Sequence, residues 1–275
     1  MINIGQYIET AINWLTEHFA SFFDALSMGI GGFIDGFQHV LFGIPFYITI
    51  AVLAALAWFK SGKGTAVFTL LGLLLIYGMG FWEETMQTLA LVLSSTCLAL
   101  LLGVPLGIWT ANSDRCNKIM RPVLDFMQTM PAFVYLIPAV LFFGLGTVPG
   151  AFATIIFAMP PVVRLTGLGI RQVPKNVVEA SRSFGATPWL LYKVQLPLAL
   201  PTILTGINQT IMMSLSMVVI AAMISAGGLG EIVLKGITQM KIGLGFEGGI
   251  AVVILAIVLD RITQGMADNR KSKKK

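Results

Sequence analysis

The stretch 171–196 holds the residue types best suited to ionic and hydrogen-bonding contact with a partner. Pro174 ends any preceding helix, and Asn176 can cap a new one with Glu179 three positions on, as in a capping box. Gly185 stands where a helix with a left-handed end favours a residue without a side chain. The spacing therefore predicts a short helix that stops at Gly185.

A second helix is predicted directly after this turn. Thr187 can cap it, and Pro188 suits its first position because the N–H that proline lacks is unpaired there anyway. Arg182 and Lys193 place charge beside apolar side chains, a mixture suited to docking against another protein. The alternative, a loop that merely joins two hydrophobic segments, would not need two capped helices.

The chain lacks a recognisable site for binding ATP. Residues 61–65 (SGKGT) come nearest to a phosphate-binding loop, but Lys63 is followed by glycine, and Ala57 stands where the first glycine of the motif belongs. A short basic turn explains this segment better. We therefore expect no catalytic residue and no bound cofactor in this chain.

Groups that would relay protons across a membrane are also missing from the hydrophobic segments. None of the thirteen acidic residues falls in the middle of one; the nearest, at segment ends, are Glu83, Glu84, Glu247 and Asp260. His18 and His39 have no matching ligands, so no metal site is expected. Buried ionisable groups usually mark ion-coupled transport, so a proton-driven mechanism is disfavoured, while a sodium site of backbone carbonyls stays open.

The composition places these residues in a membrane protein. Of the 275 residues, 56% are hydrophobic and only 11% are charged, and the mean hydropathy is +0.84, which excludes a soluble enzyme. The net charge of +5 does not indicate a nucleic-acid partner, because five of the eighteen Lys and Arg residues crowd into 270–275.

We predict an all-α polytopic membrane protein with about seven transmembrane helices, each needing about 20 mostly apolar residues. The expected spans are Ile44–Phe59, Gly64–Phe81, Thr85–Thr110, Gln128–Gly146, Val148–Val163, Pro197–Ala226 and Leu244–Ile262. The segments that follow the first, third, fifth and seventh spans carry all Lys and Arg residues except Lys235 and Lys241. The positive-inside rule then predicts a cytoplasmic C-terminus and an external N-terminus.

Residues 1–43 are expected to form a separate acidic, amphipathic region without any Lys or Arg. Apolar residues from Ile4 to Leu26 recur at steps of three and four, opposite a polar face that includes Glu9 and Glu17. A helix lying in the membrane interface is one interpretation; a helix packed on the spans is the other. Residues 44–265 would be the transmembrane domain. Residues 266–275 would be a basic cytoplasmic tail, which either contacts anionic lipid or only holds the C-terminus inside.

The loop sequence resembles the EAA signature of permease subunits of ATP-binding-cassette (ABC) importers. The matching positions are Glu179, Ala180, Ser181, Gly185, Val194, Leu196 and Pro197. Ser181 and Val194 replace the usual alanine and isoleucine. The resemblance implies the fold of a type I ABC importer permease, with the loop as a coupling helix on a separate ATPase that binds ATP and magnesium.

Three further segments resemble the importers of glycine betaine and proline betaine. They are residues 125–138, residues 157–161, and residues 206–209 followed by 215–220. This resemblance implies a bacterial inner-membrane subunit of an osmoprotectant importer, working as two permease copies with two ATPases and an external substrate-binding protein, among membrane lipids and without nucleic acid.

A translocation path can be suggested only from residue types. Thr205, Gln209, Met212 and Ser216 form one polar stripe at helical spacing, which either lines a path or joins helices by hydrogen bonds. Phe133 and Tyr135 offer aromatic faces to a trimethylammonium group.

Other readings stay open at this point. Choline, carnitine or an amino acid could be the cargo, because nothing in these spans selects the ligand. Outside the importer class, the chain could be an ion-coupled carrier that works alone.

Overall fold

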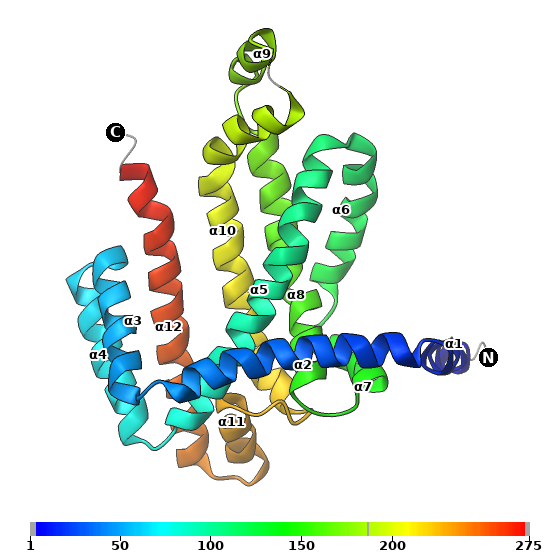
Figure 1. Ribbon diagram of the computed structural model, residues 1–275. Coiled ribbons are helices and arrows are strands. Elements are labelled where there is room, and N and C mark those ends of the chain that lie inside the picture. Colours follow the sequence, from blue (N-terminus) through cyan, green and yellow to red (C-terminus); the bar gives the residue numbers. More distant parts are fainter. Residues whose placement is uncertain (1–3, 186, 273–275) are drawn as a thin grey trace.

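The computed structural model describes residues 4–185 and 187–272, and every regular element in that part is a helix (Figure 1). The predicted all-α class is confirmed. The elements are α1 (Ile4–His18), α2 (Ala20–Gly43), α3 (Phe46–Ser61), α4 (Lys63–Gly78), α5 (Trp82–Asn112), α6 (Asp114–Thr129), η1 (Ala132–Tyr135), α7 (Leu136–Phe143), α8 (Thr147–Arg171), α9 (Lys175–Ser183), α10 (Pro188–Ala222), α11 (Leu229–Thr238) and α12 (Ile242–Ser272).

Helices α5, α8 and α10 form the centre of the bundle. Gly103 and Gly107 let α5 approach α8 closely, because a side chain at Gly103 would meet Val162. About two turns nearer its N-terminus, α5 also meets α10, where the Thr96 hydroxyl donates to Ser214 Oγ at 3.0 Å. Small residues and hydrogen bonds from side-chain hydroxyls usually pack helices together inside a membrane, where the hydrophobic effect no longer drives their association.

Within the described residues, four helices are long and apolar enough to cross a membrane on their own. They are Trp82–Asn112, Thr147–Arg171, Tyr192–Ala222 and Ile242–Met266. Two bent helix pairs, α2 with α3 and α6 with α7, bring the number to as many as six if each pair is one span. The shorter apolar helix α4 lies beside α3 and α12 (Figure 1).

The expected span Gln128–Gly146 is wrong as a single helix. The axis bends by 107° between α6 and α7. Met130 lies in extended conformation (φ −69°, ψ 133°) because the ring of Pro131 disfavours a helical residue before it. As a result, α6 runs beside α8 and α7 turns across the bundle (Figure 1).

Two other spans are longer than expected. Helix α8 continues past Val163 to Arg171, and α10 begins at Pro188 rather than Pro197. The second helix of the predicted loop is therefore the first part of a long transmembrane helix. The turn after α9 is therefore joined without a break to the membrane-spanning part of α10.

The N-terminal region forms two helices that break at Phe19, whereas the sequence pattern indicates one. Helix α2 lies across the bundle, bent by 102° from α3 (Figure 1). Its buried Ile30 and Ile34 pack with Leu91 and Ala151, so α2 is held by the other helices. This contact favours the packed alternative for α2, while an interfacial position stays a prediction.

The positively charged connections gather at one end of the bundle. Figure 1 places the α3–α4 turn, the α5–α6 turn, α9 and the C-terminal end of α12 together, and places α11 at the opposite end. Lys235, one exception to the charge pattern, pairs with Glu231 on α11 at 2.8 Å. The predicted basic tail, 266–275, falls mostly on residues whose side chains lie outside the described part.

Close packing at Gly107 predicts that Gly107→Ala destabilises the bundle. The added methyl carbon would lie 2.5 Å from Thr166 Cβ and 2.8 Å from the Val163 carbonyl oxygen, and the backbone atom cannot yield easily. Overpacking of this kind costs about 1–3 kcal/mol. Thermal denaturation of the purified protein in detergent should show a lower melting temperature.

Gly249→Ala is the matched control for that measurement. Gly249 also lies inside an apolar helix, but a Cβ there meets nothing within 4 Å. Alanine at such a site should leave the melting temperature unchanged or raise it. Equal melting temperatures for both variants would contradict the tight α5–α8 contact.

Candidate functional site

The predicted docking loop is a helix that projects from one end of the bundle (Figure 1). Helix α9 begins at Lys175, and Pro174 with ψ of 131° is its N-cap residue. Asn176 does not cap it; its Oδ1 instead accepts from the Val177 backbone N–H at 3.0 Å. The predicted cap at Asn176 is therefore wrong by two residues, because proline leads directly into the first turn.

The end of α9 and the start of α10 follow the predictions. Gly185 has φ of +78°, and its N–H donates to the Arg182 carbonyl at 2.9 Å. Thr187 is the N-cap of α10, where its Oγ1 accepts from Leu190 N at 3.4 Å. Phe184, directly before Gly185, is 92% exposed. A bare aromatic ring at a projecting turn suits contact with a partner.

The signature residues divide into an outward group and an anchoring group. Glu179, Ala180 and Gly185 are exposed, and so is Pro197 further along α10. Ser181 is half-buried, and its hydroxyl donates to the Val177 carbonyl at 2.8 Å.

The anchoring group holds α9 against the helix ends. Val178 and Leu196 pack on a buried cluster made of Ile170, Val173, Ala199 and Ile203. Val194 is half-buried. Leu196 thus positions the loop, and Glu179 is left free to face a partner.

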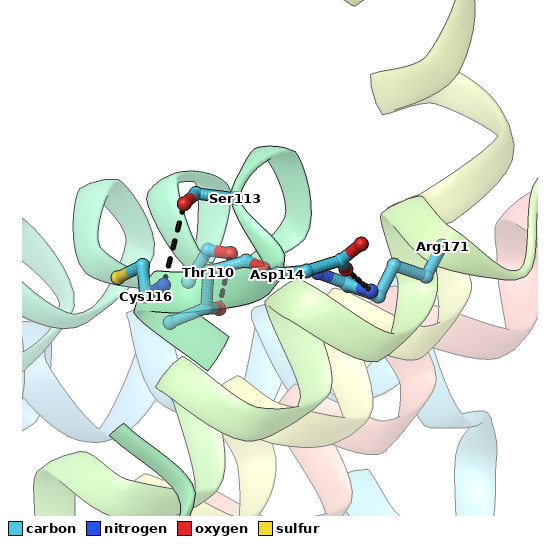
Figure 2. Close-up of polar contacts among 6 residues, drawn as sticks. Thr110, Ser113, Asp114, Cys116 and Arg171 are labelled. Atoms are coloured by element: carbon cyan, nitrogen blue, oxygen red, sulfur yellow. Dashed lines mark hydrogen bonds and ion pairs between the residues drawn. The ribbon is translucent and has the colours of Figure 1, made fainter. Parts of the chain in front are cut away.

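The base of the docking helix is tied to two other helices through Arg171, the last residue of α8. Figure 2 shows its guanidinium reaching Asp114 Oδ1 of α6 and the Thr110 carbonyl of α5, each at 2.7 Å. Ser113 caps α6 beside this pair by accepting from Cys116 N at 3.3 Å. Sequence reasoning missed this link, although Ser113 and Asp114 mark a helix start.

A second link joins α5 and α10 at the same level. The Asn112 side-chain amide donates to Tyr192 Oη at 2.6 Å. A polar cavity of about 370 Å³ lies between α9 and these helix ends. Its lining includes Asn112, Arg171, Lys175, Glu179, Arg182 and Gln195. The charged side of α9 and the helix ends therefore share one polar region that can respond to a bound partner.

Most of the polar stripe of α10 is exposed, although Met212 packs at its edge against the apolar core. Thr205, Gln209 and Ser216 are exposed and Met212 is half-buried. The hydroxyls of Thr205 and Ser216 donate to carbonyls of their own helix, at 3.1 and 2.9 Å. The polar contacts from α10 to its neighbours come from other positions: Tyr192 and Ser214 contact α5, and Asn208 contacts Asp260 of α12. Within the described residues, the stripe therefore does not join helices of one chain.

The two aromatic candidates separate in the structure. Phe133 on η1 is 51% exposed. Tyr135 is 6% exposed, its hydroxyl donates to the Met127 carbonyl, and its ring meets Phe157 edge-on at 5.8 Å. The expectation that Tyr135 offers its face to a ligand is corrected, because the ring is packed inside the bundle.

Comparisons with known proteins agree with this geometry. Residues 103–271 match the family model described as "Binding-protein-dependent transport system inner membrane component". The chain is 51% identical, over 99% of its length and 77% of the relative, to the glycine betaine/proline betaine transport system permease protein ProW of Escherichia coli (strain K12). It is 52% identical to the glycine betaine/carnitine transport permease protein GbuB of Listeria monocytogenes, over 99% of this chain and 97% of that one.

A solved structure has the same fold. A chain from the inward-facing MetNI methionine ABC transporter aligns with a TM-score of 0.62 at 20% identity, covering 69% of this chain and 95% of that one. The expected fold of an ABC importer permease is therefore confirmed.

Proposed function

The chain belongs to the family of binding-protein-dependent transport system inner membrane components, and we propose that it imports glycine betaine or a related quaternary-ammonium solute with energy from a separate ATPase. The single observation that carries the coupling role is the exposed α9, with Glu179 facing outward and Gly185 ending the helix. The relatives named for glycine betaine, at about half identity over nearly the whole chain, support the substrate.

The proposed assembly has two copies of this permease, two ATPases and an external substrate-binding protein in the inner membrane. Helix α9 and the C-terminus would face the cytoplasm, and the N-terminus would lie outside. The positive-inside rule supports this orientation, because the basic connections lie at the α9 end of the bundle. ATP and magnesium would bind to the ATPases, so this subunit performs no catalysis itself.

The proposed mechanism is rigid-body rocking driven through α9. Binding of ATP closes the two ATPases and draws the two α9 helices together. Because Arg171 joins the end of α8 to α5 and α6, and α10 continues from the α9 turn, the bundle moves as a unit and opens outward. Substrate then enters from the binding protein, and hydrolysis returns the bundle to the inward-open state.

Uptake and co-purification in cells test this proposal. Cells without glycine betaine uptake of their own would express the chain together with an ATPase and a substrate-binding protein of a glycine betaine importer. We expect labelled glycine betaine to enter at high salt and the tagged permease to retain the ATPase. Excess unlabelled choline, carnitine or an amino acid should compete poorly; strong competition by carnitine, which the Listeria relative is named for, would change the substrate. Failure to retain any ATPase would overturn the coupling role.

A further inference from the structure

An ion pair joins α6 to α8 inside the membrane-crossing part of α8, where charged side chains are unexpected. Arg164 Nη2 lies 2.7 Å from Asp125 Oδ1. Because α8 continues to Arg171, Arg164 lies about 10 Å inside the end of a membrane-crossing helix. Asp125 lies on the first helix of the bent pair α6 and α7, which together also qualify as a span.

The pair is open on the surface of the single chain. The Arg164 and Asp125 side chains are 45% and 64% exposed. Charged groups at membrane depth are costly against lipid, so they face water or protein instead. The surface of α6 and α8 that carries this pair is therefore a water-filled or protein-covered face, and lipid does not cover it.

The same face carries the polar stripe of α10. Val162 and Thr166 of α8 point toward α5, since they would meet side chains placed at Gly103 and Gly107. Arg164 lies two residues from each, which turns it about 200° away from α5.

On α10, too, a residue two positions from one that contacts α5 points away from α5. Ser214 bonds to α5, and Ser216 lies two residues further along and is exposed. Because α8 and α10 pack directly together, as at Gly206 against Leu165, both outward faces lie on the side away from α5 and form one surface.

We propose that Arg164 and Asp125 line the translocation path and form a transient site for a zwitterion. This inference rests on the proposed function, and assigns to it the residues that meet the substrate inside the membrane. Arg164 would bind the carboxylate of the solute, and Asp125 would attract its quaternary ammonium group.

The chemistry of the pair fits a solute with both charges. A guanidinium offers two parallel N–H donors to a carboxylate. A quaternary ammonium has no N–H, so it needs only a negative charge nearby, which Asp125 supplies. When the solute leaves, the two side chains pair again, so no charge is left alone at membrane depth. Because the ion pair competes with the solute for the same two side chains, the solute passes through the site and is not held tightly.

The test replaces the pair by leucines and measures transport and ATP hydrolysis together. Arg164→Leu with Asp125→Leu keeps an α6–α8 contact, since apolar pairs often replace ion pairs without loss of stability. Reconstituted with ATPase and binding protein, this variant should take up glycine betaine about tenfold more slowly or worse, as expected when charge-assisted contacts are lost. Its ATP hydrolysis, stimulated by the loaded binding protein, should stay near that of the unchanged protein.

Lys235→Gln with Glu231→Gln is the control, because it removes a similarly exposed ion pair on α11. It should leave uptake unchanged. Unchanged uptake by the leucine variant would overturn the proposal, and so would parallel loss of uptake and ATP hydrolysis, which indicates only a structural tie. If the unchanged protein itself takes up no glycine betaine, the proposed function fails. That result can be told apart from both outcomes for the leucine variant, because they require an unchanged protein that transports.

Discussion

Glu179→Lys is expected to abolish ATP-driven uptake and to leave the protein folded in the membrane. Glu179 is exposed on α9, and its backbone carbonyl accepts a hydrogen bond from Ser183 Oγ at 3.0 Å, which a lysine at this position would keep. The reversed charge would face the ATPase at the docking surface, where like charges placed together cost several kcal/mol. Uptake by reconstituted vesicles and the amount of protein in the membrane fraction check the two parts of this prediction.

Glu9→Lys is the control for the charge change. Glu9 is also exposed on a helix, but α1 lies far from α9 (Figure 1). This variant should transport normally. Normal uptake by Glu179→Lys as well would remove α9 from the coupling role.

Gly185→Val is expected to reduce uptake strongly through the shape of the backbone alone. The φ of +78° at Gly185 is left-handed, and a Cβ there meets nothing within 4 Å, so no clash confuses the result. A β-branched residue in that region costs about 1–2 kcal/mol or more. Strain of this size at the end of α9 would displace Glu179 and the exposed Phe184 relative to the ATPase.

Gly185→Asn distinguishes backbone conformation from side-chain size. Asparagine adopts left-handed conformations far more readily than valine. We therefore expect its uptake to lie close to that of the unchanged protein, measured side by side with the valine variant. Equal loss in both variants would show that the turn cannot accept any side chain, and the conformational explanation would then be wrong.

Local rules predicted the docking loop well because its geometry is set by neighbours in sequence. Gly185 and Thr187-Pro188 each determine a helix end within a few residues. The wrong N-cap at Asn176 is also a local error of two residues, since Pro174 determines where α9 begins. The resemblance to the family signature adds the proposal that this loop couples the permease to an ATPase.

Longer-range features could not be predicted from hydropathy. The sequence pattern stops the span at Val163 because Arg164 is charged, yet α8 continues to Arg171, since a charged side chain ends an apolar run without ending the helix; Asp125 on α6 pairs with Arg164. Tyr135 looks like an available aromatic face in sequence, but the bend at Pro131 folds it against Phe157. Both outcomes depend on partners brought together only by the fold.

Uptake of labelled glycine betaine into vesicles loaded with ATP tests the central claim most directly. The vesicles would contain this chain with its ATPase, with the binding protein supplied outside. We expect uptake that requires ATP, the ATPase and the binding protein together, and that stops in Glu179→Lys. Uptake by this chain alone, driven by an ion gradient, would contradict it and would direct attention to Gln209 as part of an ion site.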